Sequence, residues 1–99
     1  MPSEFRHVDP RELRVPSSRR HGADRVKLQR QIARFGATSL GMPSLVVYKG
    51  TDGVLVIYNG VTRATRMALL APGTLVRVEV IGQLRRAYGP APKIGDLLT

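Results

Sequence analysis

The sequence contains no cysteine and no tryptophan, and it has only three tyrosines and two phenylalanines. The lack of cysteine excludes disulfides, thiolate metal sites and thiol redox chemistry. Long apolar runs are also lacking, because the longest ones, residues 45–48 and 54–58, are far too short to cross a bilayer. Residues 1–15 carry no apolar segment typical of a signal peptide. We therefore expect a cytoplasmic protein that makes no use of a membrane.

Basic residues greatly outnumber acidic ones. Sixteen Lys and Arg stand against seven Asp and Glu, which gives a formal net charge of +9, and thirteen of the sixteen cations are Arg. The planar guanidinium matches phosphate oxygens well, so this excess favours polyanionic partners such as nucleotides or nucleic acid. Charge alone does not distinguish a surface that binds such partners from a basic surface that is simply well solvated.

Size and composition predict one domain. Ninety-nine residues, of which 42% are hydrophobic, suffice for one hydrophobic core. We expect a single α+β domain over residues 1–99, with a small mixed β-sheet and packed helices. Its core should span about residues 7–82. The N-terminal segment and the tail 83–99 are rich in proline and polar residues, so we expect them to be peripheral.

Hydrophobic periodicity and turn residues predict the order of the elements. Asp24 is a suitable N-cap for a helix, and Gly36 is a suitable C-terminal stop for it. The Asp52-Gly53 pair predicts a hairpin turn between two strands rich in β-branched residues. The expected elements are an edge strand at 5–8, a helical turn at 9–13, helices at 24–35 and 61–71, strands at 45–48, 54–58 and 75–81, and a short turn at 94–98.

Basic side chains recur along one side of the first predicted helix. Lys27, Arg30 and Arg34 are three and four residues apart, so they form a stripe roughly 130° away from the apolar side. Together with Arg19 and Arg20, this stripe is a candidate nucleic-acid surface that would follow a phosphate backbone. An ordinary solvated helix face has the same pattern, so both interpretations stay open.

The most informative motif is the strand-to-helix turn Asn59-Gly60-Val61-Thr62-Arg63. A helix that begins directly after a strand presents the unpaired backbone N–H groups of its first turn, and these attract an anion. Gly60 lets a ligand approach the backbone closely. Arg63 lies in the first helical turn, where the macrodipole disfavours a cation unless an anion is shared. Arg66, one turn further on, is a candidate for a second side of the same site; alternatively, Arg63 extends to solvent or pairs with an acid.

No constellation of residues identifies a reaction or a metal site. His7 and His21 are isolated in the sequence, so no metal ligands are expected. Asp9, Glu12 and Glu79 are candidate general bases beside a bound phosphate, although capping and surface roles explain them equally well. Asp9 and Glu79 are also candidate ion-pair partners for the arginine of the turn. The catalytic residues, if there are any, are unknown.

Five segments of the chain carry a family resemblance. They are Val8-Asp9-Pro10-x-x-Leu13, Leu28-x-x-x-Ile32-x-x-x-Gly36, Met42-Pro43-x-Leu45-Val46-Val47, Val56-Ile57-Tyr58-Asn59-Gly60-x-x-Arg63 and Leu75-Val76-Arg77-Val78-Glu79-Val80-Ile81. Their order and spacing, over roughly residues 7–82, resemble the ParB N-terminal domain, also called the ParB-like nuclease domain of the ParB/sulfiredoxin-like superfamily.

The resemblance implies a ParB/sulfiredoxin-like fold in which Gly60, Val61, Thr62 and Arg63 hold the phosphates of a nucleotide, CTP or ATP. It leaves a need for Mg²⁺ undefined, and it allows a ParB-like nuclease or a nucleotide hydrolase. Sulfiredoxins carry a cysteine between the glycine and the arginine of this turn, so sulfinic acid reduction is not expected here.

Partitioning ParB proteins also differ from this sequence. In them the glycine is followed by Glu-Arg-Arg and, three residues later, by alanine. Here Val61 and Thr62 replace the first two and Arg66 replaces the alanine, which argues against CTP hydrolysis. Those proteins continue into a DNA-reading helix-turn-helix, for which too few residues follow Gly82, so we do not expect site-specific operator binding.

Three functions remain open at this point. The first is a ParB-like module that binds a phosphate or nucleotide at residues 59–63, with or without weak activity on nucleotides or nucleic acid. The second is a nonspecific nucleic-acid-binding module that uses the basic residues above. The third is a non-catalytic adaptor or regulator from a mobile element, whose partner is another protein. A shared fold does not decide among them.

Overall fold

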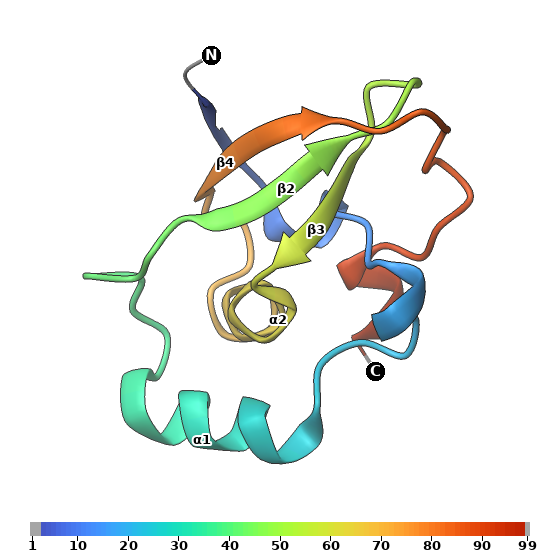
Figure 1. Ribbon diagram of the computed structural model, residues 1–99. Coiled ribbons are helices and arrows are strands. Elements are labelled where there is room, and N and C mark those ends of the chain that lie inside the picture. Colours follow the sequence, from blue (N-terminus) through green and yellow to red (C-terminus); the bar gives the residue numbers. More distant parts are fainter. Residues whose placement is uncertain (1–2, 99) are drawn as a thin grey trace.

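The computed structural model describes residues 3–98 as a small α+β fold in which a four-stranded mixed sheet lies over two helices (Figure 1). The sheet order is β1-β4-β2-β3; β1 pairs with β4 and β2 pairs with β3 antiparallel, whereas β2 and β4 run parallel. The elements are β1 (Glu4–Val8), η1 (Pro10–Glu12), η2 (Ser17–Arg19), α1 (Arg25–Phe35), β2 (Leu45–Lys49), β3 (Leu55–Asn59), α2 (Val61–Leu70), β4 (Val76–Gln83) and η3 (Ile94–Leu97). The predicted fold class, a mixed sheet with packed helices, is confirmed.

Local sequence signals place the ends of α1. The carboxylate of Asp24 accepts a hydrogen bond from the backbone N–H of Lys27 at 3.0 Å, which makes it the expected N-cap. Gly36 has a φ of 58° and donates its N–H to Ile32 O at 2.8 Å, which ends the helix. The boundaries predicted for this helix are therefore confirmed to within a residue.

The core lies between the sheet and α2. Three side chains of the sheet, Leu45, Val47 and Ile57, are fully buried against Ala64 and Met67 of α2. Small residues along this side of α2 let the helix axis approach the strands closely. In β4 the buried and exposed residues alternate as the sequence predicts, although the strand continues two residues further, to Gln83.

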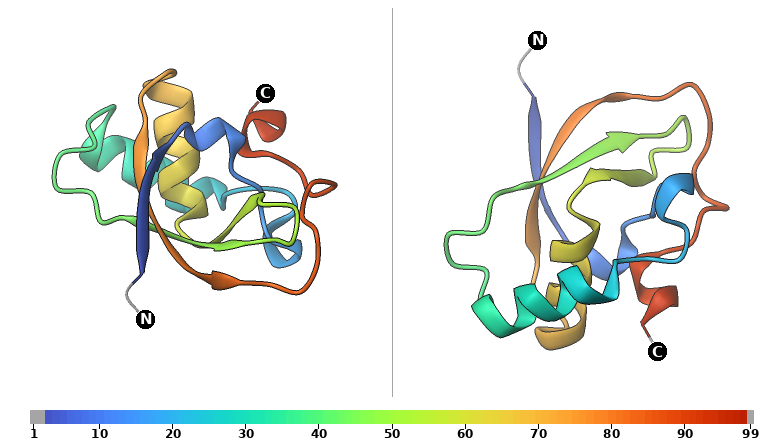
Figure 2. Two further views of the ribbon diagram at one scale, coloured as in Figure 1. Left: turned by 90° about the horizontal axis from the view of Figure 1, so that it is seen from above. Right: turned by 60° about the horizontal axis from the view of Figure 1, so that its bottom comes forward.

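Helix α1 forms an outer layer, with α2 between it and the sheet (Figures 1 and 2). None of its residues is buried, and its apolar residues Leu28 and Ile32 are half-buried against the rest of the protein. Within residues 3–98 no helix is long and apolar enough to cross a membrane. Helix α1 thus has no fully buried apolar side chain, a point that bears on the site described below.

The prediction that residues 83–99 are peripheral is wrong for much of this tail. Ile94 is 1% exposed and belongs to the hydrophobic core, and its N–H donates to Leu13 O at 2.8 Å. The segment around Arg14, which lies within the predicted core span, exchanges backbone hydrogen bonds with Leu55 and Ile57 at the free edge of β3. Together these segments cover a strand edge that would otherwise leave its N–H and C=O groups unpaired.

Candidate functional site

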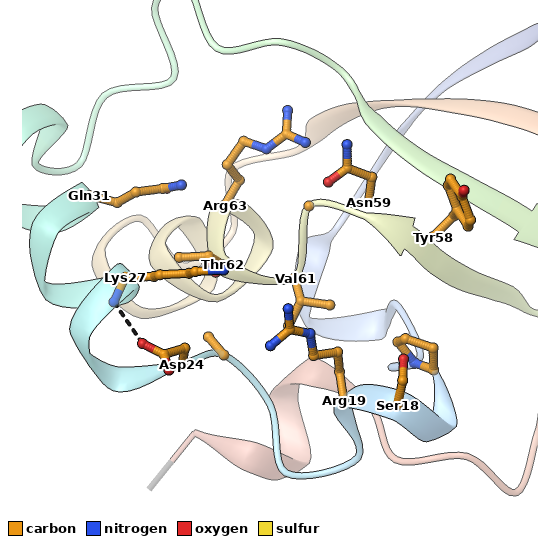
Figure 3. A pocket seen from close by; sticks show the side chains of 13 residues that line it. Ser18, Arg19, Asp24, Lys27, Gln31, Tyr58, Asn59, Val61, Thr62 and Arg63 are labelled. Atoms are coloured by element: carbon orange, nitrogen blue, oxygen red, sulfur yellow. Dashed lines mark hydrogen bonds between the residues drawn. The ribbon is translucent and has the colours of Figure 1, made fainter.

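A cavity of about 560 Å³ opens between α1, η2 and the turn that leads from β3 into α2 (Figure 3). All five residues of the predicted turn, Asn59 to Arg63, line it. Segments distant in sequence complete its walls, including Pro16 and Ser18 of the η2 region and Gln31 of α1. This volume lies within the range of roughly 300–1,000 Å³ that is usual for small-molecule sites.

Gly60 fixes the shape of the turn. Its φ of +120° is rarely adopted by residues with a side chain, and a Cβ placed on it would lie 2.6 Å from Leu45 Cδ2. The first backbone hydrogen bond of α2 runs from Ala64 N to Gly60 O at 2.9 Å, and no side chain caps the helix among the described residues. The N–H groups of the first turn of α2 are thus free to bind an anion at the cavity wall.

Three cationic side chains line the cavity: Arg19 of η2, Lys27 of α1 and Arg63 of α2. Arg63 donates to Pro43 O at 3.1 Å and to Ser44 O at 3.4 Å, so its guanidinium is held in place by backbone carbonyls. Within the described residues it has no acidic partner, which leaves its charge uncompensated. Burial lowers the pKa of Arg63, but a guanidinium remains protonated at neutral pH.

Asp24 is the one carboxylate among the described residues that line the cavity. The hydrogen bond from the Lys27 N–H lowers the pKa of this carboxyl below its ordinary value. With three cations and one anion, the cavity carries a net positive charge. Asp24 is occupied as the helix cap, which makes it a weak base.

Arg66, a predicted member of the site, does not line this cavity. Its side chain is 1% exposed and donates to Gly36 O and Thr38 O, both at 2.8 Å, at the C-terminal end of α1. Arg66 lies three residues after Arg63, on the same side of α2, and both side chains line a second, smaller cavity of about 70 Å³ that Phe35 and Met42 also line. The structure thus places Arg66 beside Arg63 but outside the 560 Å³ cavity, and its predicted contact with a phosphate stays a prediction.

The predicted basic stripe is divided between two surroundings. Lys27 and Arg19 line the cavity, whereas Arg20 and Arg30 are exposed outside it. Arg34 lies against the Phe35 ring, with its Cζ 5.2 Å from the ring centroid. The five residues predicted to bind nucleic acid thus do not form one continuous groove around this cavity.

Tyr58 is a cavity residue that the sequence reasoning missed. It is 67% exposed at the cavity wall, and its ring meets that of Tyr48 almost perpendicularly, with centroids 5.6 Å apart and planes at 86°. An edge-to-face pair leaves at least one face of the Tyr58 ring free. The signal that could have found it is its place immediately before the Asn59-Gly60 turn, as a large aromatic residue on an exposed strand position.

The candidate general bases lie away from the cavity. Asp9 caps η1 by accepting from Arg11 N at 2.9 Å, and Glu12 pairs with Lys93 at 3.0 Å. Glu79 lies on β4, and none of the three acids lines the cavity. Among residues 3–98 there is no group of three His, Asp or Glu side chains that could hold a metal ion.

Comparison with known proteins does not assign the chain to a family. No protein-family model matches it, and no curated protein matches it either. Chemical interpretation of the site therefore depends on its own residues: a positively charged cavity, an uncapped helix N-terminus and an exposed aromatic ring.

Proposed function

We propose that this chain is a ParB/sulfiredoxin-like domain that binds a nucleotide, with the phosphates held at the 59–63 turn. The observation that carries the proposal is that Arg19, Lys27 and Arg63 come from three separate elements and line one cavity at the N-terminus of α2. The sequence resemblance and the α+β architecture with its strand-to-helix turn support the fold assignment.

The phosphates are proposed to lie over Gly60 and the first turn of α2. Backbone N–H groups there would donate to phosphate oxygens, and the positive end of the helix dipole favours the negative charge. The Arg63 guanidinium, positioned by the Pro43 and Ser44 carbonyls, would bind the same oxygens with charge-assisted hydrogen bonds. Lys27 and Arg19 would neutralise the remaining charge.

The base is proposed to stack on Tyr58. In Figure 3, Tyr58 lies at the opposite side of the cavity from Lys27 and Gln31, so a ligand that is anionic at one end and aromatic at the other fits the arrangement. Stacking on an aromatic ring tolerates any base and contributes about 1–3 kcal/mol. An inorganic phosphate would leave this ring unused, which favours a nucleotide over a smaller anion.

The residues at the cavity support binding of a nucleotide without its hydrolysis. Asp24, the one described carboxylate at the cavity, caps α1 and has a lowered pKa, so it is poorly suited to remove a proton from water. Asp9, Glu12 and Glu79 lie outside the cavity. We accordingly propose a nucleotide-binding module, and CTP and ATP are the nucleotides to test first.

Two pairs of neighbouring cations test the proposal by titration calorimetry with ATP, CTP and tripolyphosphate. Arg19→Ala is compared with Arg20→Ala, and Lys27→Ala with Arg30→Ala. In each comparison the first variant removes one positive charge from the cavity, and the second removes one positive charge outside it. We expect the cavity variants to bind at least tenfold more weakly, about 1.4 kcal/mol, and the controls to change less than twofold.

Other outcomes would identify the other functions. If all four variants weaken binding to a DNA duplex equally, and affinity falls steeply with salt, the basic surface is a nonspecific nucleic-acid-binding surface. If the protein binds neither nucleotides nor DNA, nucleotide binding is wrong, and a role as a protein-binding adaptor becomes the better explanation.

A further inference from the structure

The buried guanidinium of Arg66 joins α2 to the end of α1. Besides its two bonds to Gly36 O and Thr38 O, its Nε donates to Gln31 Oε1 at 3.4 Å. Its Nη2 lies 3.3 Å from the sulfur of Met42, and its Cζ lies 5.4 Å from the centre of the Phe35 ring. A single side chain of α2 thus contacts α1 and the loop that follows it.

These contacts matter because α1 lies at the surface of the molecule, in the outer layer (Figure 1). None of its eleven residues is buried, and Val26 and Phe35 are 54% and 43% exposed. An isolated helix of this length is marginal in water, so its position depends on contacts with the rest of the protein. Arg66 supplies the buried polar part of those contacts.

The electrostatics of the contact are favourable without a carboxylate. Arg66 binds the carbonyl of Gly36, the C-cap of α1, where the helix dipole is negative, and the carbonyl of Thr38 in the loop that follows. Replacing the guanidinium would leave these partly buried oxygens without a donor. The pairing is therefore specific to a side chain with several donors, and a lysine would reproduce only part of it.

We infer that Arg66 is a positioning residue that holds Gln31 and Lys27 of α1 at the wall of the nucleotide cavity. Gln31 provides the direct link, since it contacts Arg66 through Oε1 and also lines the cavity. Lys27 lies four residues earlier, on the same side of the helix, and lines the cavity too. The part of the inference that concerns ligand affinity rests on the proposed function, whereas the part that concerns the position of α1 is tested without a ligand.

Hydrogen exchange is the ligand-free test. In Arg66→Lys and Arg66→Met we expect the amides of residues 28–36 to exchange at least tenfold faster, while those of β4 keep their protection. Arg34→Met is the matched control, because Arg34 lies against the same Phe35 ring, whereas the side-chain hydrogen bonds to the Gly36 and Thr38 carbonyls come from Arg66. Unchanged exchange in α1 of the Arg66 variants would overturn the inference. Arg66→Lys keeps the test usable if Arg66→Met does not fold.

A double-mutant cycle tests the link to the cavity, with ATP and tripolyphosphate as probes. We expect Arg66→Lys to weaken both about tenfold in the native background and by much less when Lys27 is already Ala, because positioning of Lys27 is then irrelevant. An equal loss in both backgrounds would show a general structural effect and reject the positioning role. If the native protein binds neither probe, the proposed function fails, and hydrogen exchange in α1 alone decides for or against Arg66.

Discussion

Arg63 and Arg66 stand three residues apart on α2, yet the first lines the cavity and the second is buried under the end of α1. Both are held by backbone carbonyls rather than by acids: Pro43 and Ser44 for Arg63, and Gly36 and Thr38 for Arg66. The two arginines each follow a threonine on the same helix and nevertheless have different surroundings, and Arg66 is the buried one.

Replacing Gly60 with alanine should destabilise the protein and distort the turn. The left-handed backbone costs a residue with a Cβ about 1–2 kcal/mol, and overpacking against the fully buried Leu45 should add about 1–3 kcal/mol. Gly73→Ala is the control, because Gly73 also has a positive φ but nothing lies within 4 Å of its added Cβ. Urea unfolding should show a clearly larger loss for Gly60→Ala. Equal losses would mean that the contact with Leu45 relaxes freely.

Tyr58 variants should separate base stacking from phosphate binding. Tyr58→Phe should keep the affinity for ATP, whereas Tyr58→Leu should lose about 1–2 kcal/mol of binding free energy, since it lacks an aromatic face. Tripolyphosphate should bind all three proteins alike. The chain has no tryptophan and three tyrosines, so the part of the tyrosine quenching by ATP that is lost in Tyr58→Phe reports stacking on Tyr58. A loss of tripolyphosphate affinity in Tyr58→Leu would instead indicate damage to the whole cavity.

Truncation of Ile94 should show that the C-terminal segment belongs to the core. Ile94 is fully buried among core residues, so Ile94→Ala should lower the free energy of unfolding by about 2–5 kcal/mol. Ile81→Ala removes the same atoms from a side chain that is 39% exposed, and it should cost much less. Denaturant melts of the two variants compare them directly; similar small losses would mean that residues 83–98 contribute little stability.

Acid should weaken the contact between Asp52 and the C-terminal loop. Burial alone would raise the pKa of Asp52, but N–H donors of Gly89, Val54 and Tyr88 outweigh it and lower the pKa below the unfolded value of about 3.9. A depressed carboxyl pKa stabilises the fold above that value, and the stabilisation is lost as pH falls through the folded pKa.

Asp52→Asn should therefore be less stable than the native protein at pH 7, and the difference should shrink below about pH 4. Urea unfolding of both proteins at pH 7 and at pH 3 measures this. Asp24 also has a lowered pKa, but it is present in both proteins and cancels in the comparison. A difference that is the same at both pH values would argue against the carboxylate charge as its cause.

The sequence located the elements well because their ends are local features. Asp24 and Gly36 bound α1 through hydrogen bonds within a few residues, and β4 shows its alternation in the chain itself. The turn at 59–63 was found for the same reason. Lys27 and Arg19 were recognised as basic candidates but were assigned to an extended nucleic-acid surface, whereas both line the cavity.

The sequence by itself determined the strands, the helices, the strand-to-helix turn and the excess of positive charge. Only the tertiary structure decided which cations share a cavity, that Tyr58 lies at its wall, that Arg66 supports α1 and that Ile94 fills the core. The physical reason is that backbone capping and hydrophobic alternation act over a few residues. The surroundings of a side chain depend on elements that are thirty or more residues away, such as Gly36 for Arg66.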